Sequence, residues 1–183
     1  MQVAQRLAVT KMRFDDIDTV QQIEHDIFPT PWPKNAYESE LARNPQAQYL
    51  VLRDGDTIVA YGGLWKVGWE AHVTTIGVRG SHQRRGYGTT MFAALIQRAY
   101  AVGARWVTLE VRASNDHAVR LYERFGLVAI ARRRGYYTDN GEDAVVMWSG
   151  ALHQSAFKRR YCEILASLDV AGIGDPPAEA YPQ

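Results

Sequence analysis

Residues 83–89 read QRRGYGT, a segment that combines two arginines with two glycines and contains no acidic residue. A strand-like run, His72–Val78, precedes it, and a helical pattern begins near Tyr87. The first turn of a helix has backbone N–H groups without intrahelical partners and the positive end of the macrodipole. Glycines there let an anion approach the backbone closely, so the segment fits a phosphate cradle.

A simpler interpretation fits the same residues, namely a turn that needs glycine and carries solvated arginines. The segment is not a P-loop, because the lysine followed by Ser/Thr is missing, and it lacks the glycine spacing of a Rossmann fingerprint. The residues alone leave both interpretations open.

Strands and short helices are predicted before this loop. Leu7–Lys11 can form a strand, and Asp15–Phe28 carries one apolar helical face with Asp15 or Asp16 available as the N-cap. Prolines then interrupt the chain, and a second short helix follows at Lys34–Asn44. Three strands come next, the first two joined by the hairpin signal DGD: Gln48–Arg53, Thr57–Trp65 and Glu70–Val78.

After the loop, the pattern continues as helix, strand, helix and two strands. The predicted elements are the helix Gly88–Val102, the strand Arg105–Val111, the helix Asp116–Phe125, and the strands Leu127–Arg133 and Asp143–Trp148 around a loop at Tyr136–Glu142. This order predicts a mixed α/β domain over residues 1–150. Beyond it, residues 151–183 carry one more apolar helical stripe and a loose tail from Gly172. The stripe either packs onto the domain or binds a partner.

Composition limits the class of protein. A chain of 183 residues with 46% hydrophobic and 22% charged residues is typical of one globular domain. Its net charge of +1 argues against binding to nucleic acid by bulk electrostatics. The single Cys162 excludes an internal disulfide, no apolar run is long enough to span a bilayer, and the N-terminus lacks a signal-peptide core. We therefore expect a cytoplasmic protein, and five histidines without ligand spacing predict no metal site.

The segments after the loop favour the phosphate interpretation. With QRRGYG, the runs LEVRASN (109–115) and LYERFG (121–126) resemble the GNAT superfamily of acetyl-CoA-dependent N-acetyltransferases. FPTPWP (28–33), TIGV (75–78) and RRRGYY (132–137) make the chain most similar to the ribosomal-protein-alanine N-acetyltransferases, the RimI group. The resemblance covers most of residues 5–149. VRGSHQ lacks an acidic residue and a proline that often precede the loop, and Leu127 replaces a common phenylalanine.

The resemblance implies a GNAT fold, with a central, mostly antiparallel mixed sheet flanked by helices, and acetyl-CoA as co-substrate. Its pyrophosphate would lie on the loop at Arg84, Arg85, Gly86, Tyr87, Gly88 and Thr89. Main-chain groups of Ile76, Gly77 and Val78 would pair with the pantetheine arm, and the Val78 N–H would polarise the thioester carbonyl. Asn115 would bond the same arm, although its position also suits a helix N-cap.

An amine attacks a thioester only when it is deprotonated, and a protein α-amino group has a pKa of about 8 against about 10.4 for lysine. The resemblance makes Glu110 the general base and Tyr122 the acid that protonates the leaving thiolate. Without it, Glu110 reads as an exposed strand residue, and the spacing of Tyr122 fits core packing.

On the acceptor side, Trp32, Tyr136 and Tyr137 could wall a slot for a peptide, or simply fill the core. The acids Asp139, Glu142 and Asp143 could attract a basic peptide, or be solvated.

The sequence thus predicts a monomeric enzyme that acetylates a protein N-terminus, with ribosomal protein bS18 as the substrate that the resemblance implies. Two alternatives are the same chemistry on a lysine or a small amine, and a non-catalytic module that senses acetyl-CoA. The presence of both Glu110 and Tyr122 argues against the sensor, which needs neither.

Overall fold

Seven strands form one sheet in the order β1-β2-β3-β4-β5-β7-β6 in the computed structural model, which describes residues 7–177. All neighbouring strands are antiparallel except β4 and β5. The mixed, mostly antiparallel sheet is therefore as predicted. The strands are β1 (Leu7–Lys11), β2 (Ala47–Asp54), β3 (Thr57–Val67), β4 (Glu70–Val78), β5 (Trp106–Arg112), β6 (Val128–Tyr137) and β7 (Glu142–Trp148).

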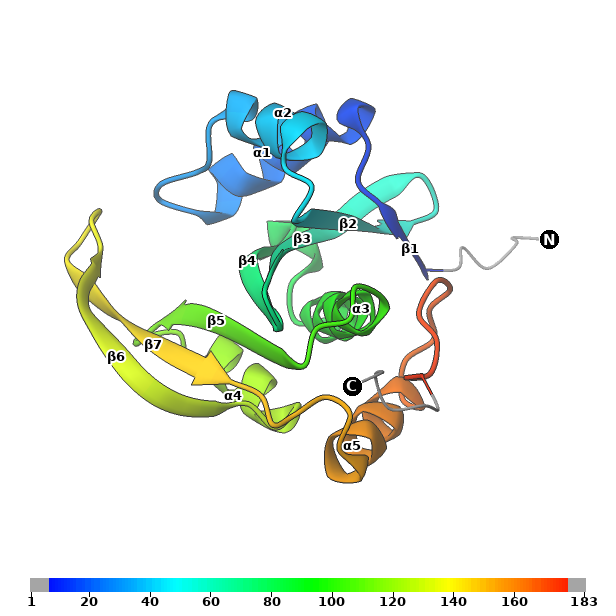
Figure 1. Ribbon diagram of the computed structural model, residues 1–183. Coiled ribbons are helices and arrows are strands. Elements are labelled where there is room, and N and C mark those ends of the chain that lie inside the picture. Colours follow the sequence, from blue (N-terminus) through cyan, green and yellow to red (C-terminus); the bar gives the residue numbers. More distant parts are fainter. Residues whose placement is uncertain (1–6, 178–183) are drawn as a thin grey trace.

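Helices cover both faces of this sheet (Figure 1). One apolar cluster joins α1 (Ile17–Ile27) and α2 (Lys34–Arg43) to β2 and β3. The other joins the opposite face to α3 (Tyr87–Ala101), α4 (Asp116–Arg124) and α5 (Ser155–Leu165). Short 3₁₀ turns precede α1 and α3, at Phe14–Asp16 and Gly80–His82. Within residues 7–177, no helix is long and apolar enough to cross a membrane.

Helix α3 is the central support of the second face. Met91, Leu95 and Ala99, which form its predicted apolar stripe, are fully buried. Val102 follows the helix as its C-cap. Because α3 packs under β2, β3, β4 and β5, it fixes the glycine loop at its N-terminus relative to the sheet.

The pairing between β4 and β5 is short. It joins Glu70–Val73 to Trp106–Leu109, and beyond these residues β4 continues to Val78 paired with β3 while β5 continues to Arg112 paired with β7. Figure 1 shows the two strands diverging from this point. The sheet therefore opens between these strands at the predicted site residues, which are Ile76, Gly77 and Val78 on β4 and Glu110 on β5.

The loop predicted at Tyr136–Glu142 is shorter in the structure. β6 continues through Tyr136 and Tyr137, and β7 already begins at Glu142, so only residues 138–141 connect the strands. Tyrosine has a high strand propensity, and the turn residues Asp139, Asn140 and Gly141 are sufficient to reverse the chain. The prediction was wrong because it assigned the whole polar-aromatic segment to the turn.

The C-terminal stripe packs onto the domain. Phe157, Tyr161 and Ile164 are buried, and the Tyr161 hydroxyl donates to the Ala93 carbonyl on α3 (3.1 Å). Farther along, Ala171 bonds to both Leu7 and Val9 and so covers the outer edge of β1. The segment predicted as a loose tail begins one residue later, and within it the Pro177 carbonyl accepts a hydrogen bond from Lys158 Nζ at 2.6 Å. Its end, residues 178–183, lies outside the described residues.

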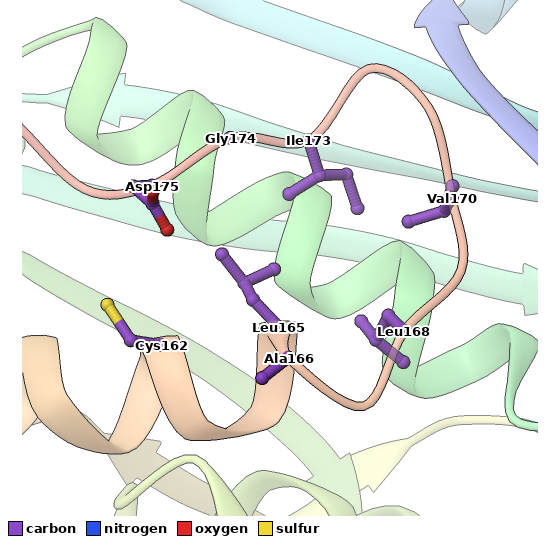
Figure 2. Close-up of a pocket in the computed structure, with 8 residues that line it drawn as sticks. All are labelled: Cys162, Leu165, Ala166, Leu168, Val170, Ile173, Gly174 and Asp175. Atoms are coloured by element: carbon purple, nitrogen blue, oxygen red, sulfur yellow. The ribbon is translucent and has the colours of Figure 1, made fainter.

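A hollow of about 280 Å³ lies between α5 and the segment that follows it. Figure 2 shows Leu165 facing Val170 and Ile173 across this space. None of the residues predicted to bind coenzyme or acceptor lines it. The hollow is therefore a packing feature of the C-terminal segment and lies apart from the candidate site.

Tyr161→Ala should lower the free energy of unfolding by about 3–5 kcal/mol, because it removes a buried aromatic ring between α5 and α3. Urea denaturation measures the change. Glu163→Ala, on the exposed side of the same helix, should change stability by less than about 0.5 kcal/mol. Equal stabilities of the two variants would contradict the packing role of α5.

Candidate active site

Glu110 lies on β5 at the point where β5 leaves β4, and its side chain is 8% exposed. Its Oε2 atom is 2.6 Å from His72 Nε2, and its Oε1 atom is 3.1 Å from Arg133 Nη2. The hydrogen bond with His72 lowers the pKa of Glu110 below its ordinary value, and Arg133 adds to this effect, while burial opposes it. The exposed strand glutamate that the residues alone suggest is therefore excluded.

Sequence reasoning missed His72 and Arg133. His72 is opposite Thr108 in the parallel ladder, and Glu110 follows Thr108 on the same face of β5. The proximity of His72 and Glu110 thus depends on a strand register across 38 residues of sequence, which no local pattern reveals. Arg133 is next to an irregularity in β6 and was one of three similar arginines.

Tyr122 lies on α4 with its ring packed edge-on against Phe92, at 4.9 Å between ring centroids. The side chain is partly buried, and this burial raises the pKa of Tyr122 above its ordinary value. The hydroxyl therefore keeps its proton at neutral pH and can donate it. The packing interpretation of its spacing is correct, and it is compatible with a hydroxyl that serves the site.

Tyr136 and Tyr137 form an edge-to-face pair at the end of β6, with ring centroids 5.2 Å apart. The Arg112 guanidinium lies 3.9 Å from the Tyr137 ring centroid. Burial raises the pKa of Tyr137 to about 12, although Arg112 opposes the shift. Tyr137 also interacts electrostatically with both Glu110 and Tyr122, so it belongs to the same cluster as the predicted base and acid.

The acids of the β6–β7 turn are already paired. Arg112 binds Asp139 through Nη2 at 2.9 and 3.0 Å and Glu142 through Nη1 at 3.3 Å. The pKa of Glu142 is lowered to about 2, and the main cause is its hydrogen bonding with Ser114. These contacts hold the turn against β5, and they leave the two acids less available to attract a basic peptide.

The predicted phosphate loop has the backbone of an open helix N-terminus. Gly86 is the N-cap of α3 with φ 84°, and no side chain caps this end of the helix. Arg84 also has a positive φ, 62°, which is uncommon for a residue other than glycine. Gly88 faces Leu121 and Val78, so the loop, α4 and the end of β4 meet here. An uncapped helix end beside exposed Arg84 and Arg85 fits a pyrophosphate.

The end of β4 has one paired and one open edge. Ile76, Gly77 and Val78 pair with β3, while the pairing with β5 has already stopped at Val73. Gly77 is required for packing, because a Cβ atom there would lie 2.3 Å from the Tyr61 ring. Their backbone groups toward β5 can therefore pair with an extended ligand.

Asn115 caps α4, since its Oδ1 atom accepts a hydrogen bond from the Ala118 N–H at 3.1 Å. The capping interpretation of this residue is correct. Because the cap uses only the oxygen, the Nδ2 group is still a donor that could reach a bound pantetheine arm.

Trp32 is held by two polar side chains of α1. The Glu24 carboxylate, which is 1% exposed, accepts from the Trp32 N–H at 2.7 Å, and the Gln21 amide donates to the Trp32 carbonyl at 2.6 Å. The other Glu24 oxygen accepts the hydroxyls of Tyr37 (2.6 Å) and Tyr61 (2.8 Å). Sequence reasoning missed Glu24. The one signal for it was an acidic residue placed next to the apolar face of the helix, and that signal does not show whether the acid is buried.

The hydrogen bonds of Glu24 connect Trp32, on the predicted acceptor side, to the end of β4, on the predicted coenzyme side. Tyr61, which donates to Glu24, also underlies Gly77 of β4. The α1–α2 loop that carries Trp32 and the β6–β7 hairpin that carries the tyrosine pair extend to the same side of the molecule in Figure 1. Within the described residues, no group of three or more His, Cys, Asp or Glu side chains could hold a metal ion.

Comparisons with known proteins agree with this geometry. The family model described as acetyltransferase (GNAT) family matches residues 17–127. A Bacillus subtilis (strain 168) protein, provisionally named a [ribosomal protein bS18]-alanine N-acetyltransferase, is 40% identical over 143 residues, which cover 78% of this chain and 95% of that protein.

Two solved structures illustrate the similarity in fold. The ribosomal-protein-S18-alanine N-acetyltransferase of Escherichia coli superposes with a TM-score of 0.72 at 29% identity, covering 78% of this chain and 92% of that one. Arabidopsis thaliana NAA60 in complex with acetyl-CoA superposes with a TM-score of 0.70 at 16% identity, covering 78% and 97%. At that identity, the second match concerns the fold alone.

Gly86→Ala should raise the KM for acetyl-CoA by about tenfold with a smaller effect on kcat, because a Cβ disfavours the left-handed backbone by about 1–2 kcal/mol. Steady-state kinetics with varied acetyl-CoA test this. Gly80→Ala is the matched control, since a Cβ there meets nothing within 4 Å and its φ is not positive. An unchanged coenzyme KM in Gly86→Ala would exclude the cradle.

Glu24→Gln should raise the KM for the acceptor more than that for acetyl-CoA and destabilise the protein by about 1–3 kcal/mol, because an amide cannot satisfy all three donors. Kinetics and urea denaturation measure both effects. Glu38→Gln, at an exposed position of α2, serves as the control. Acceptor kinetics that match the wild type would show that Glu24 does not position the Trp32 loop.

Proposed function

Because the chain belongs to the acetyltransferase (GNAT) family, we propose that it transfers the acetyl group of acetyl-CoA to a protein N-terminal amine. Acetyl-CoA is the co-substrate of this N-acetyltransferase, as its sequence predicts. The observation that carries the proposal is the buried carboxylate of Glu110, placed where β4 and β5 separate. Ribosomal protein bS18, through its N-terminal alanine, is the acceptor that we propose.

The names of the relatives support this acceptor. Both the Bacillus subtilis protein and the Escherichia coli structure are named for the alanine of ribosomal protein S18. This chain spans nearly the whole length of each. A ribosomal acceptor would place the enzyme in the cytoplasm, and we propose that it acts there as a monomer.

In this proposal, one group of residues binds the coenzyme and another transfers protons. Arg84, Arg85 and the N–H groups of residues 86–89 bind the pyrophosphate, and the open edge of residues 76–78, with Asn115, binds the pantetheine arm. The Val78 N–H polarises the carbonyl under attack. Glu110 helps to remove the proton of the amine, and Tyr122, which remains protonated, supplies one to the leaving sulfur.

The aromatic residues on the acceptor side would hold the first residues of the peptide. Trp32 is fixed by Glu24 and Gln21, and the Tyr136–Tyr137 pair is fixed by Arg112. We propose that this chemistry belongs to residues 1–150, and that residues 151–183 support α3 and the edge of β1.

Mass spectrometry of acetyl transfer tests the proposal directly. A synthetic peptide with the bS18 N-terminus should be acetylated once, at its α-amino group, while the same peptide blocked at the N-terminus should stay unmodified. Labelling of both peptides would favour a lysine-directed or relaxed enzyme. Labelling of neither, with acetyl-CoA still bound, would contradict the acceptor and favour a small amine or the sensor.

The test substitution in this assay is Glu110→Gln. It should lower kcat by about 10²–10⁴-fold, because an amide cannot take part in proton removal, and leave the affinity for acetyl-CoA unchanged. Glu123→Gln, at an exposed position of α4, should act as the wild type. A Glu110→Gln enzyme with the wild-type rate would remove Glu110 from the mechanism.

A further inference from the structure

Glu110 shares its site with an imidazole that no motif identified. His72 is 34% exposed and approaches the Glu110 carboxylate at 2.6 Å. We propose that the general base is a His72–Glu110 pair, in which Glu110 orients the ring and His72 Nδ1 accepts the proton of the acceptor amine. This inference rests on the proposed N-acetyltransferase function and deepens it.

The fold brings the pair together at a defined place. His72 is in the last stretch of β4 that still pairs with β5, and Glu110 is just beyond the last paired residue of β5. Both residues therefore lie at the point where the two strands separate. Their 2.6 Å contact places the imidazole ring directly beside the carboxylate.

The hydrogen bond fixes the tautomer. An ionised carboxylate only accepts hydrogen bonds, so the Nε2 atom that faces Glu110 must carry the hydrogen. In the neutral ring the second nitrogen, Nδ1, then has a free lone pair. A histidine oriented in this way by a carboxylate is the arrangement used by many general bases.

The lowered pKa of Glu110 argues against its carboxylate as the final proton acceptor. The pKa of Glu110 is lowered by His72 and then by Arg133, so the carboxylate binds a proton weakly. A general base must hold the proton that it removes, so a carboxylate that binds a proton weakly is better suited to orient the ring than to accept the proton itself.

Charged and titratable groups approach the pair from the sides of β3 and β6, and one of them is Glu40 of α2, which accepts a hydrogen bond from Trp65 Nε1. Arg133 and Tyr137, both on β6, interact with Glu110, and Trp65 is the residue opposite His72 on β3. Arg133 holds the second oxygen of Glu110, so the carboxylate is fixed from both sides.

The proton balance of the step is complete. The ammonium of the acceptor gives one proton to His72 Nδ1, and the nitrogen lone pair forms the N–C bond to the acetyl carbon while the C–S bond breaks. The attacking nitrogen, which still carries two hydrogens, loses the second one to water as the amide forms, and the sulfur takes the hydroxyl proton of Tyr122. His72 then releases its proton to solvent through its exposed side, and Tyr122 regains one from water.

Chemical rescue separates this role from a structural one. His72→Ala should lower kcat by at least about a hundredfold with little change in the KM for acetyl-CoA. Added imidazole should restore activity, and a series of substituted imidazoles should give rates that rise with their pKa. Glu110→Gln should not respond to imidazole, and His153→Gln, at an exposed position, should act as the wild type.

A second variant keeps the hydrogen bond and removes the base. His72→Gln can still donate an amide hydrogen to Glu110, and it should be as slow as His72→Ala. Either wild-type activity of His72→Gln or rescue that does not depend on imidazole pKa would overturn the proposal and leave Glu110 as the base. The assay uses whichever amine the wild-type enzyme acetylates, so failure of the bS18 peptide contradicts that acceptor and not the pair.

Discussion

The structure depends on the early separation of two parallel strands. β4 and β5 pair through only four residues each, from Glu70 to Val73 and from Trp106 to Leu109. A longer ladder would satisfy the backbone of β4 internally and leave no open edge for a ligand. The separation is stable because each strand keeps a partner on its other side, β3 for β4 and β7 for β5. The sheet thus contains a ligand-binding edge without an unsupported strand.

The open edge is coupled to the acceptor side through close contacts between glycine and tyrosine. Tyr61 lies where a Cβ of Gly77 would be, and its hydroxyl reaches the buried carboxylate of Glu24. Because Glu24 also holds the Trp32 N–H, the same packing that shapes the end of β4 fixes the α1–α2 loop. The glycine of the TIGV motif therefore has a packing role on one face, in addition to any contact that its backbone makes with coenzyme.

Local patterns were sufficient for the order of the helices and strands, although not for the end of β6, and for residues that belong to one segment. Periodicity predicted the buried face of α3, and the glycine loop was visible because its geometry depends on consecutive residues. The His72–Glu110 contact was not predictable, since it requires the register of two strands that are distant in sequence. Glu24 was missed because a helix pattern shows which positions are apolar and not which acid is buried with its hydrogen-bond donors.

In the mechanism that we propose, the electrostatics of the site would favour an N-terminal amine over a lysine. Asp139 and Glu142 are engaged by Arg112, so selection by free acidic residues around the acceptor is weak. The ease of deprotonation then matters more, and a lysine amine with a pKa about 2.4 units above that of an α-amino group costs about 3 kcal/mol more to deprotonate. The lowered pKa of the Glu110 carboxylate makes it a weak proton acceptor, so it does not supply that difference. In the mechanism that we propose, the chemistry of the proton acceptor would thus select for the N-terminus independently of any contact with the peptide.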